Sequence, residues 1–258
     1  MTIDFSKYSS VRIGGAFEVQ VLDGNAEFTG FVVGGANNLL VSPSPKKLGI
    51  LDKKFDFIKI LEQNAEFAVL EIGCAASAKK IHTFCKERNL GGLEFLRKIP
   101  GLLGGLIKMN AGLKNECVGE NLTSVRVFSG ETPKEKIAFG YRYCGLCKPM
   151  FSAKFKLKFG FDGKKDEMLK TARDNQPSGA SFGSIFKNPS GDFAGRLIEA
   201  VGLKGYCKGD AMISNKHANF LINKKNASFE DAIYLIELVE KRVFEGFGVR
   251  LEREVIVI

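Results

Sequence analysis

Residues 181–202 read SFGSIFKNPSGDFAGRLIEAVG and combine a glycine turn, a lone hydroxyl and the start of a helix. The hydroxyl belongs to Ser184, which stands between a glycine and an apolar pair. Further on, Asp192 is placed to cap a helix that Gly202 should stop. The stretch therefore predicts a turn that contains Ser184, followed by an amphipathic helix. The apolar face of this helix consists of Phe193, Ala194, Leu197, Ile198 and Val201.

The residues that follow predict a longer helix and a closing strand. Ser228 and Asp231 form a capping box, and Gly246 is the expected end of this helix. The closing residues LEREVIVI are apolar at both parities from Val255 onward, which is typical of a strand buried on two faces. The apolar stripe of the longer helix consists of Ala232, Ile236, Val239 and Val243.

Glu254 lies at the start of the closing strand, on the same side as Ile256 and Ile258. A carboxylate directed at a core edge costs free energy unless it is paired, protonated or faces a pocket. The strand pattern leaves two interpretations open: an ion pair with a nearby basic residue, or an acid that faces a binding site.

The first half of the chain predicts short strands and one helix. The segments FEVQVL, FVV and LLV are typical of strands, and SPSPKK excludes a helix after the last of them. Ser77 is placed to cap a helix with Ile81, Phe84 and Cys85 on one face. His82 points away from that face, so we expect a solvated surface histidine. A boundary between lobes is expected after FKLKFGFDGKKDE.

Composition is that of a globular α+β protein. The 258 residues are 45% hydrophobic and 26% charged, enough for one to three compact lobes. The first residues, MTIDFSKYSS, lack the basic and apolar regions of a signal peptide, so we expect a cytoplasmic protein without membrane insertion. The net charge of +9 suits an anionic small molecule, a membrane surface or nucleic acid. Because the lysines occur in short pairs without a nucleic-acid motif, we do not expect nucleic-acid binding.

The six cysteines are expected to be free thiols. Cys144 and Cys147 form a C-x-x-C, but no second such pair provides the other ligands of a zinc site. A thioredoxin-type pair should open a helix, whereas proline follows shortly after Cys147. We therefore expect no metal site, and no redox-active cysteine pair at Cys144 and Cys147.

Two glycine-rich segments suggest close approach of the backbone to a ligand. The first, VVGGANNLLV, leaves one strand and enters another, so it is not a dinucleotide-binding fingerprint, which needs a helix. Consecutive amides in such a turn can still form an anion-binding nest. The second, GGLEFLRKIPGLLGGLIKMNAG, packs glycines around Pro100. Either segment alone is also compatible with a tight turn.

In their order along the chain, these segments resemble one family. The segments that carry the resemblance are SSVRIGG, VVGGANNLL, GLEFLRKIPGLLGGLIKMNAG, YRY, GSIFKNP, AGRLIEAVGLKG, KHANFLIN and LEREV, which cover nearly the whole chain. The sequence resembles the UDP-N-acetylenolpyruvoylglucosamine reductases of bacterial peptidoglycan synthesis. It is similar to their shorter subgroup, which lacks a tyrosine-bearing insertion.

The resemblance implies a fold and a reaction. The expected fold is a two-lobed FAD-binding unit of the vanillyl-alcohol-oxidase type, with lobes at residues 1–50 and 51–157, followed by an α+β substrate-binding domain at 158–258. The expected reaction uses NADPH and FAD to reduce UDP-N-acetylglucosamine enolpyruvate to UDP-N-acetylmuramate. A monomer is expected.

The resemblance also implies roles for individual residues. Ser184 matches the proton donor of the family, while Arg142, in YRY, and Glu254, in LEREV, match its catalytic arginine and glutamate. Substrate contacts are expected from Asn188, Lys204 and His217, although a buried structural histidine is an equal alternative for His217. The positions expected to line the flavin are Gly34, Gly35, Asn37, Asn38, Gly101, Gly104, Gly105, Asn110, Ala111 and Gly112.

The chain departs from the family pattern at a few of these positions. Ala36 and Asn37 replace a glycine and a serine in the first loop, and Leu102 replaces a hydroxyl residue in the second. Cys144 replaces the serine that usually follows the YRY segment. FAD binding is therefore expected to depend more on backbone amides or to be weaker. Two other functions stay open at this point: a flavin oxidase or dehydrogenase of the same fold, and a basic binding protein without catalytic activity.

Overall fold

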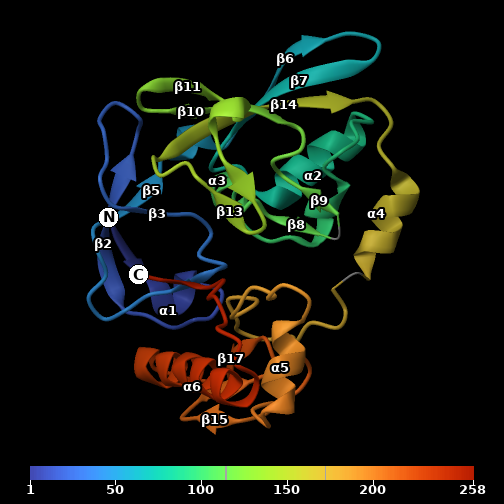
Figure 1. Ribbon diagram of the computed structural model, residues 1–258. Helices are drawn as coiled ribbons and strands as arrows, with labels where there is room; N and C mark the ends of the chain where they lie inside the picture. The colour runs from blue at the N-terminus through green and yellow to red at the C-terminus, as the bar shows by residue number, and fades with distance from the viewer. Residues whose placement is uncertain (114, 172) are drawn as a thin grey trace. The chain divides into compact units, whose positions relative to one another are not determined.

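The computed structural model describes residues 1–113, 115–171 and 173–258, which form an α+β fold (Figure 1). The chain divides into two compact units. The boundaries at residues 50 and 157 stay a prediction. Unit 1 consists of Met1–Val19, Ala36–Lys46 and Asp174–Ile258, and unit 2 of Gln20–Gly35 and Lys47–Arg173.

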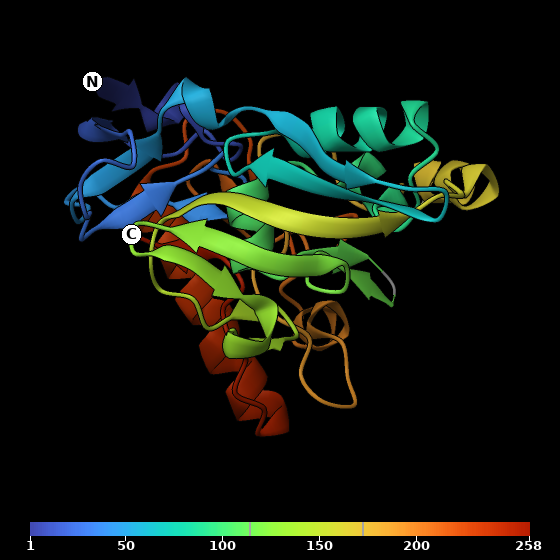
Figure 2. The same ribbon diagram turned by 90° about the horizontal axis from the view of Figure 1, so that it is seen from above.

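Unit 2 is built around a five-stranded antiparallel sheet of order β11-β10-β14-β7-β6 (Figure 2). Alternate side chains of β7 are buried, as expected for a strand with one face against a core. They pack with Phe155 and Leu157 of β14 and with Ile81 of α2. The strands are β6 (Ile58–Gln63), β7 (Phe67–Gly73), β10 (Leu122–Val127), β11 (Gly130–Pro133) and β14 (Met150–Lys158).

Smaller elements complete unit 2. The expected strand FVV is β3, which pairs in parallel with β5, and β12 and β13 form an antiparallel pair. Their bounds are β3 (Phe31–Val33), β5 (Leu48–Leu51), β8 (Gly112–Leu113), β9 (Glu116–Cys117), β12 (Phe139–Gly140), β13 (Tyr143–Cys144), α2 (Ala78–Glu87), α3 (Leu103–Lys108), α4 (Gly163–Lys170) and the 3₁₀ turns η1 (Lys53–Phe55), η2 (Glu94–Lys98) and η3 (Lys134–Lys136).

The α2 helix begins as predicted, but its histidine does not lie at the surface. The Ser77 hydroxyl accepts a hydrogen bond from the Lys80 amide, and Ile81 is buried. His82 is also buried, with Nε2 2.8 Å from Oδ1 of Asp166, so the expectation of a solvated histidine is wrong. The reason is that α4 supplies a carboxylate from far along the chain, which periodicity within α2 could not reveal.

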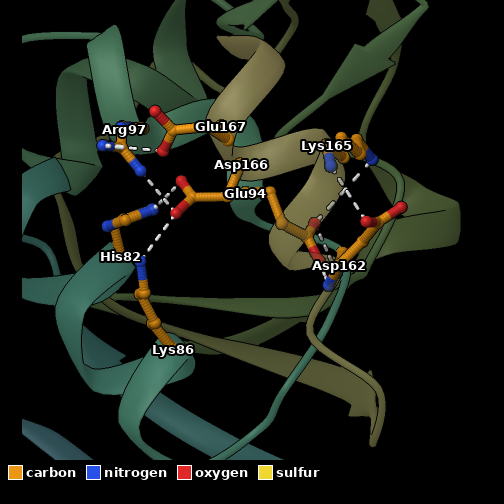
Figure 3. A network of polar contacts seen from close by, with 9 residues as sticks. His82, Lys86, Glu94, Arg97, Asp162, Lys165, Asp166 and Glu167 are labelled. Carbon is orange, nitrogen blue, oxygen red and sulfur yellow. Dashed lines mark hydrogen bonds and ion pairs between the residues drawn. The ribbon is translucent and has the colours of Figure 1, made fainter. Parts of the chain in front are cut away.

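Asp166 is the centre of a buried polar network (Figure 3). Its carboxylate is 1% exposed and pairs with His82, Lys86 and Arg97. Burial alone would raise the pKa of Asp166, but hydrogen bonds from Arg97, Lys86 and His82 outweigh it and hold the pKa well below its usual range. Beside it, buried Glu94 accepts from the amides of Gly92 and Asp162. The network fixes α4 against α2 and η2.

Unit 1 contains a three-stranded sheet, β15-β16-β17, against which α6 packs. A second pair joins β4 and β18 in parallel. The strand β2 begins in unit 1, where it pairs with β1, and ends in unit 2. The bounds are β1 (Thr2–Asp4), α1 (Phe5–Tyr8), β2 (Ala16–Leu22), β4 (Leu39–Leu40), α5 (Ala194–Ala200), β15 (Cys207–Lys208), β16 (Ala211–Ile213), β17 (Leu221–Asn223), α6 (Phe229–Phe247) and β18 (Ile256–Val257).

The α5 helix starts differently from the prediction. Phe193 occupies the N-cap position and is 67% exposed, so it is not part of the buried face. The predicted cap, Asp192, accepts from the Phe193 amide just outside the helix and binds Arg196. Asn188 instead accepts a hydrogen bond from the amide of Ala194. The helix ends before Gly202, which has a φ of 74°, as predicted.

The α6 helix and the closing strand are partly as predicted. The capping box of Ser228 and Asp231 is present, and the predicted stripe is buried. Gly246 does not end the helix, because the left-handed turn that ends it falls on Gly248, with a φ of 68°. After buried Val255, the residues of β18 are only half-buried, since β18 has β4 as its single neighbour in that sheet.

Among the residues described, no helix combines the length and apolar character that a membrane crossing needs.

Candidate active site

Ser184 lies in a short extended segment of unit 1. It follows Gly183, which has a φ of 88°, and forms an isolated antiparallel bridge with Phe220. The next residue, Ile185, donates its amide hydrogen to the main-chain oxygen of Asn219 at 2.9 Å. The Ser184 segment is therefore anchored to the KHANFLIN segment, while Ser184 itself is half-buried.

Glu254 is brought next to this segment by main-chain hydrogen bonds. Its amide donates to the oxygen of Ile185 at 2.8 Å. Asn38, from the first glycine-rich segment, donates from its side-chain Nδ2 to the main-chain oxygen of Glu254 at 2.9 Å. The main-chain oxygen of Asn38 accepts from the amide of Ile256 at 3.0 Å. Main-chain hydrogen bonds thus join Glu254 to the residue after Ser184, and the Asn38 side chain joins the same segment.

The basic residues around Glu254 have carboxylate partners. Arg253 binds Glu240 of α6 through two nitrogens, Nε at 2.5 Å and Nη2 at 2.8 Å. Lys187 binds Glu252 at 2.5 Å. These ion pairs fix the backbone on either side of the Ser184 and Glu254 segments.

The three predicted substrate contacts lie near α5. Asn188 accepts from the first amide of the helix, and Lys204 pairs with Glu199 at 2.9 Å. His217 is half-buried, and an ideal Cβ on Gly195 would come within 3.0 Å of its ring. Burial lowers the pKa of His217, and the charge of Lys204 lowers it further. This arrangement favours a neutral imidazole beside a cation.

In unit 2, Arg142 lies on a tight turn. Its φ is 54°, which is uncommon for a residue with a side chain. Its guanidinium donates to the oxygen of Gly112 at 3.5 Å and lies 5.2 Å from the ring centre of Tyr141. Asn110 holds the same turn, since Nδ2 donates to the oxygen of Gly140 at 3.0 Å. Arg142, Asn110 and Gly112 are therefore close together.

The other predicted cofactor positions leave room near the backbone. A Cβ placed on Gly34 or on Gly105 would meet no protein atom within 4 Å. The Gly104 amide donates to the oxygen of Cys74, and Gly101 has a φ of 123° with its oxygen accepting from Ala78. The open space at Gly34 and Gly105 leaves the backbone of these two segments accessible to close approach by another group. Gly35, Asn37 and Ala111 are half-buried in the same segments.

The departures from the family pattern have visible structural effects. Ala36 adopts a φ of 48°, the left-handed conformation that a glycine takes easily, and is 3% exposed. Leu102 is the N-cap of α3 and provides no side-chain hydrogen bond. Cys144 is buried, and burial raises the pKa of its thiol. All six cysteines are free.

No cluster of metal-ligating side chains occurs in the part of the chain that the structure describes.

Comparison with known proteins decides the family. The family model of the UDP-N-acetylenolpyruvoylglucosamine reductase C-terminal domain matches residues 175–258. The chain is 66% identical to the UDP-N-acetylenolpyruvoylglucosamine reductase of Campylobacter jejuni strain RM1221 over the full length of both. It is 45% identical to that of Helicobacter hepaticus, over 98% of this chain and 97% of the relative. This chain belongs to the UDP-N-acetylenolpyruvoylglucosamine reductase family.

A solved member of the reductase family has the same fold. The crystal structure of the reductase from Thermus caldophilus superposes with a TM-score of 0.86 at 28% identity, covering 100% of this chain and 98% of the other. The resemblance inferred from the sequence is confirmed, and the chain is an enzyme of the oxidoreductase class.

Two features of this family member could not be found from the sequence. The first is the network around Asp166, whose partners are far apart along the chain. The second is Asn219, a buried side chain that bonds both main-chain groups of Phe186. It lies within KHANFLIN, but no local pattern marks the asparagine there as different from a turn residue.

Proposed function

We propose that this chain reduces the enolpyruvyl double bond of UDP-N-acetylglucosamine enolpyruvate, giving UDP-N-acetylmuramate for peptidoglycan synthesis. The names of its close relatives support the substrate. The hydrogen bonds that join the main chain of the Ser184 segment to Glu254, and Glu254 to Asn38, carry the proposal, because Ser184 and Glu254 are the residues that we propose as proton donor and catalytic carboxylate. The proposal includes a monomer that acts in the cytoplasm, where NADPH and nucleotide sugars are available.

The cofactor we propose is FAD, held in a two-lobed unit of the vanillyl-alcohol-oxidase type. Bound FAD would take a hydride from NADPH and supply it to the substrate. The residues that fit it are the glycines at Gly34 and Gly105, where no side chain fills the space, and the turns at Gly101 and Gly104. Asn37, Asn38, Asn110, Ala111, Gly35 and Gly112 complete the proposed lining.

Ser184 is proposed to deliver the proton. Addition of a hydride to one carbon of the enol ether places negative charge on the neighbouring carbon and its carboxylate. The Ser184 hydroxyl would protonate that carbon, and the serine alkoxide must then be stabilised by its surroundings. A serine held in one position by its neighbours suits this step, because the proton must reach a single face of the substrate.

Arg142 and Glu254 are proposed to act on the substrate carboxylate. A guanidinium can bind a carboxylate through two parallel hydrogen bonds and neutralise the charge that builds there. Such fixed charges act best when they are oriented before the reaction. Lys204 is proposed to face the diphosphate of the nucleotide, with Asn188 and His217 on the sugar.

The test is a stopped-flow experiment on the purified flavoprotein. The flavin is reduced with NADPH without oxygen, and the enolpyruvyl substrate is then added while flavin absorbance is followed. In Ser184→Ala we expect flavin reduction to be nearly unchanged and reoxidation by the substrate to slow by about 100-fold or more. Ser190→Ala, an exposed serine of the same loop, is the matched control. Reoxidation of Ser184→Ala at the wild-type rate would remove the proposed role.

A further inference from the structure

The position of Ser184 depends on the two residues that follow it. Ile185 and Phe186 are 0% and 1% exposed, so their four main-chain polar groups have no access to water. Buried main-chain groups need partners inside the protein. The hydrogen-bond partners of these four groups therefore fix the backbone that carries Ser184.

Asn219 satisfies three of the four groups. The Ile185 amide donates to the Asn219 main-chain oxygen at 2.9 Å. The Phe186 amide donates to Oδ1 of Asn219 at 2.9 Å, and Nδ2 of Asn219 donates to the Phe186 oxygen at 2.8 Å. The side-chain amide thus takes the place of a neighbouring strand at Phe186.

The fourth group links this segment to Glu254. The Ile185 oxygen accepts from the amides of Glu254 and Val255, at 2.8 and 3.2 Å. The Ser184 segment is therefore held on one side by Asn219 and on the other by the Glu254 segment. A shift of the asparagine side chain would move the serine relative to the glutamate.

Asn219 also contacts a third site residue. The main-chain amide of Asn219 donates to Nδ1 of His217 at 3.2 Å. An Nδ1 that accepts a hydrogen bond leaves the ring proton of the neutral imidazole on Nε2. One buried asparagine, 4% exposed, thus bonds the two residues that follow Ser184 and, through its main chain, the ring of His217.

We propose that Asn219 is a positioning residue for proton transfer, because its side-chain amide fixes the Ser184 hydroxyl in register with Glu254. The inference rests on the proposed role of Ser184. The side-chain amide is needed because its Oδ1 accepts from the Phe186 amide while its Nδ2 donates to the Phe186 oxygen. An ionised carboxylate of the same shape would accept only, and it would face the Phe186 oxygen with a second oxygen.

The test compares Asn219→Asp and Asn219→Ala in the two half-reactions. We expect flavin reduction by NADPH to stay within about threefold of wild type and reoxidation by the enolpyruvyl substrate to slow by about 10- to 100-fold, as small displacements of reacting groups do. General loosening of the fold would instead slow both half-reactions. Equal slowing of both, or reoxidation of Asn219→Asp at the wild-type rate, would overturn the proposal.

Acidic pH provides a rescue that distinguishes the two variants. When the introduced carboxyl is protonated, its hydroxyl can donate to the Phe186 oxygen and restore the lost bond. We expect the reoxidation rate of Asn219→Asp, divided by that of wild type, to recover as the pH falls, whereas Asn219→Ala does not recover. The division removes pH effects that wild type and variant share, including any that arise from the charged groups on the surrounding segments, namely Lys187, His217, Arg253 and Glu254.

A second readout does not depend on activity. Hydrogen exchange of peptides that contain Ile185 and Phe186 should be faster by about tenfold in Asn219→Asp at neutral pH, while exchange in α6 stays at the wild-type rate. The matched control is Asn223→Asp. Asn223 is equally buried, but its side chain bonds the oxygens of Val11 and Arg12 instead. We expect this control to leave the ratio of the two half-reactions unchanged.

A double variant separates this inference from the proposed function. If Asn219 acts through Ser184, Asn219→Asp should slow reoxidation by a smaller factor in the Ser184→Ala background than in wild type. An equal factor in both backgrounds would overturn the positioning role while leaving Ser184 as the donor. If Ser184→Ala alone reoxidises normally, the proposed function itself fails.

Discussion

Ala36 carries a backbone conformation that glycine adopts more easily than alanine. Its φ of 48° lies in the left-handed region, where a Cβ costs roughly 1–2 kcal/mol. Its oxygen accepts from both the amide and the hydroxyl of Ser10, at 3.1 and 3.3 Å. These bonds hold the turn in place even though the residue is an alanine. The strain therefore lies directly beside Asn37 and Asn38.

Two substitutions test this account of Ala36. Ala36→Gly relieves the strain but removes a buried methyl group worth about 0.8 kcal/mol, so we expect the free energy of unfolding to change by less than about 1 kcal/mol. Ala36→Val, which adds a branched side chain in the same conformation, should lose about 2 kcal/mol or more. Urea unfolding measures both. A larger loss for glycine than for valine would contradict the assigned strain.

At the scale of single residues, the sequence identified groups but not their contacts. Ser184, Asn38 and Glu254 were predicted from separate segments, and hydrogen bonds join Glu254 to Asn38 and to Ile185, the residue after Ser184. Asn219 could not be predicted, because its two bonds to Phe186 join residues 33 positions apart. Local pattern contains no information about such a pair.

Among the elements, α4 is held in part by buried polar contacts. Its buried Asp166 meets His82 and Lys86 from α2 and Arg97 from η2, and Figure 3 shows these side chains converging on one carboxylate. Charged groups that lose this partner would stay partly buried without compensation. The helix is thus fixed by a buried carboxylate together with one buried apolar residue, Leu169.

Asp166→Asn should destabilise the protein in a pH-dependent way. At neutral pH we expect a loss of about 2 kcal/mol in the free energy of unfolding, as for other hydrogen bonds to charged groups. Because the folded pKa of Asp166 is lowered, its contribution is complete above the unfolded value of about 3.9 and is lost as the pH falls below it. The difference between wild type and variant should therefore be constant near neutrality and shrink in acid.

The matched control for this prediction is Glu167→Gln on the same helix. The Glu167 side chain is 63% exposed, so its ion pairs with Lys170 and with Arg97 should contribute little. Denaturant unfolding across the pH range measures both variants. A difference between wild type and Asp166→Asn that grows in acid would contradict the assigned protonation state.

Elements were predicted well where the signal was local and poorly where it was not. The serine cap of α2, the capping box of α6 and the strands β2 and β3 follow from residues close together in the sequence. The burial of His82 depends on a carboxylate 84 residues away. The start of α5 depends on Asn188, which lies outside the helical pattern.

For the whole molecule, charge is the property most relevant to a nucleotide substrate. The chain carries a formal charge of +9, and the proposed substrates are anions. A positive field raises the local concentration of anionic ligands and weakens with salt. We expect the KM for the enolpyruvyl substrate to rise several-fold between about 0.05 and 0.5 M sodium chloride, with little change in kcat.

Steady-state kinetics at constant pH measure this effect. Sucrose at equal osmolarity is the control for solvent effects that do not involve charge. A KM that is independent of salt would mean that the positive charge is not used to attract the substrate.

Unit 1 is composed of three separate stretches, and this has a consequence for synthesis on the ribosome. The parallel pair β4 and β18 joins residues near Leu39 to residues near Ile256, and the bond from Asn38 to Glu254 spans 216 residues. The early stretches must therefore wait, exposed, until almost all of the chain has been translated. Unit 2 meets no such delay, because all its strands have emerged once Arg173 has left the exit tunnel. A pause in translation late in the message would leave the Ser184 segment without its Glu254 neighbour, and a nascent chain stalled there would depend on chaperones to cover Leu40 and Val41.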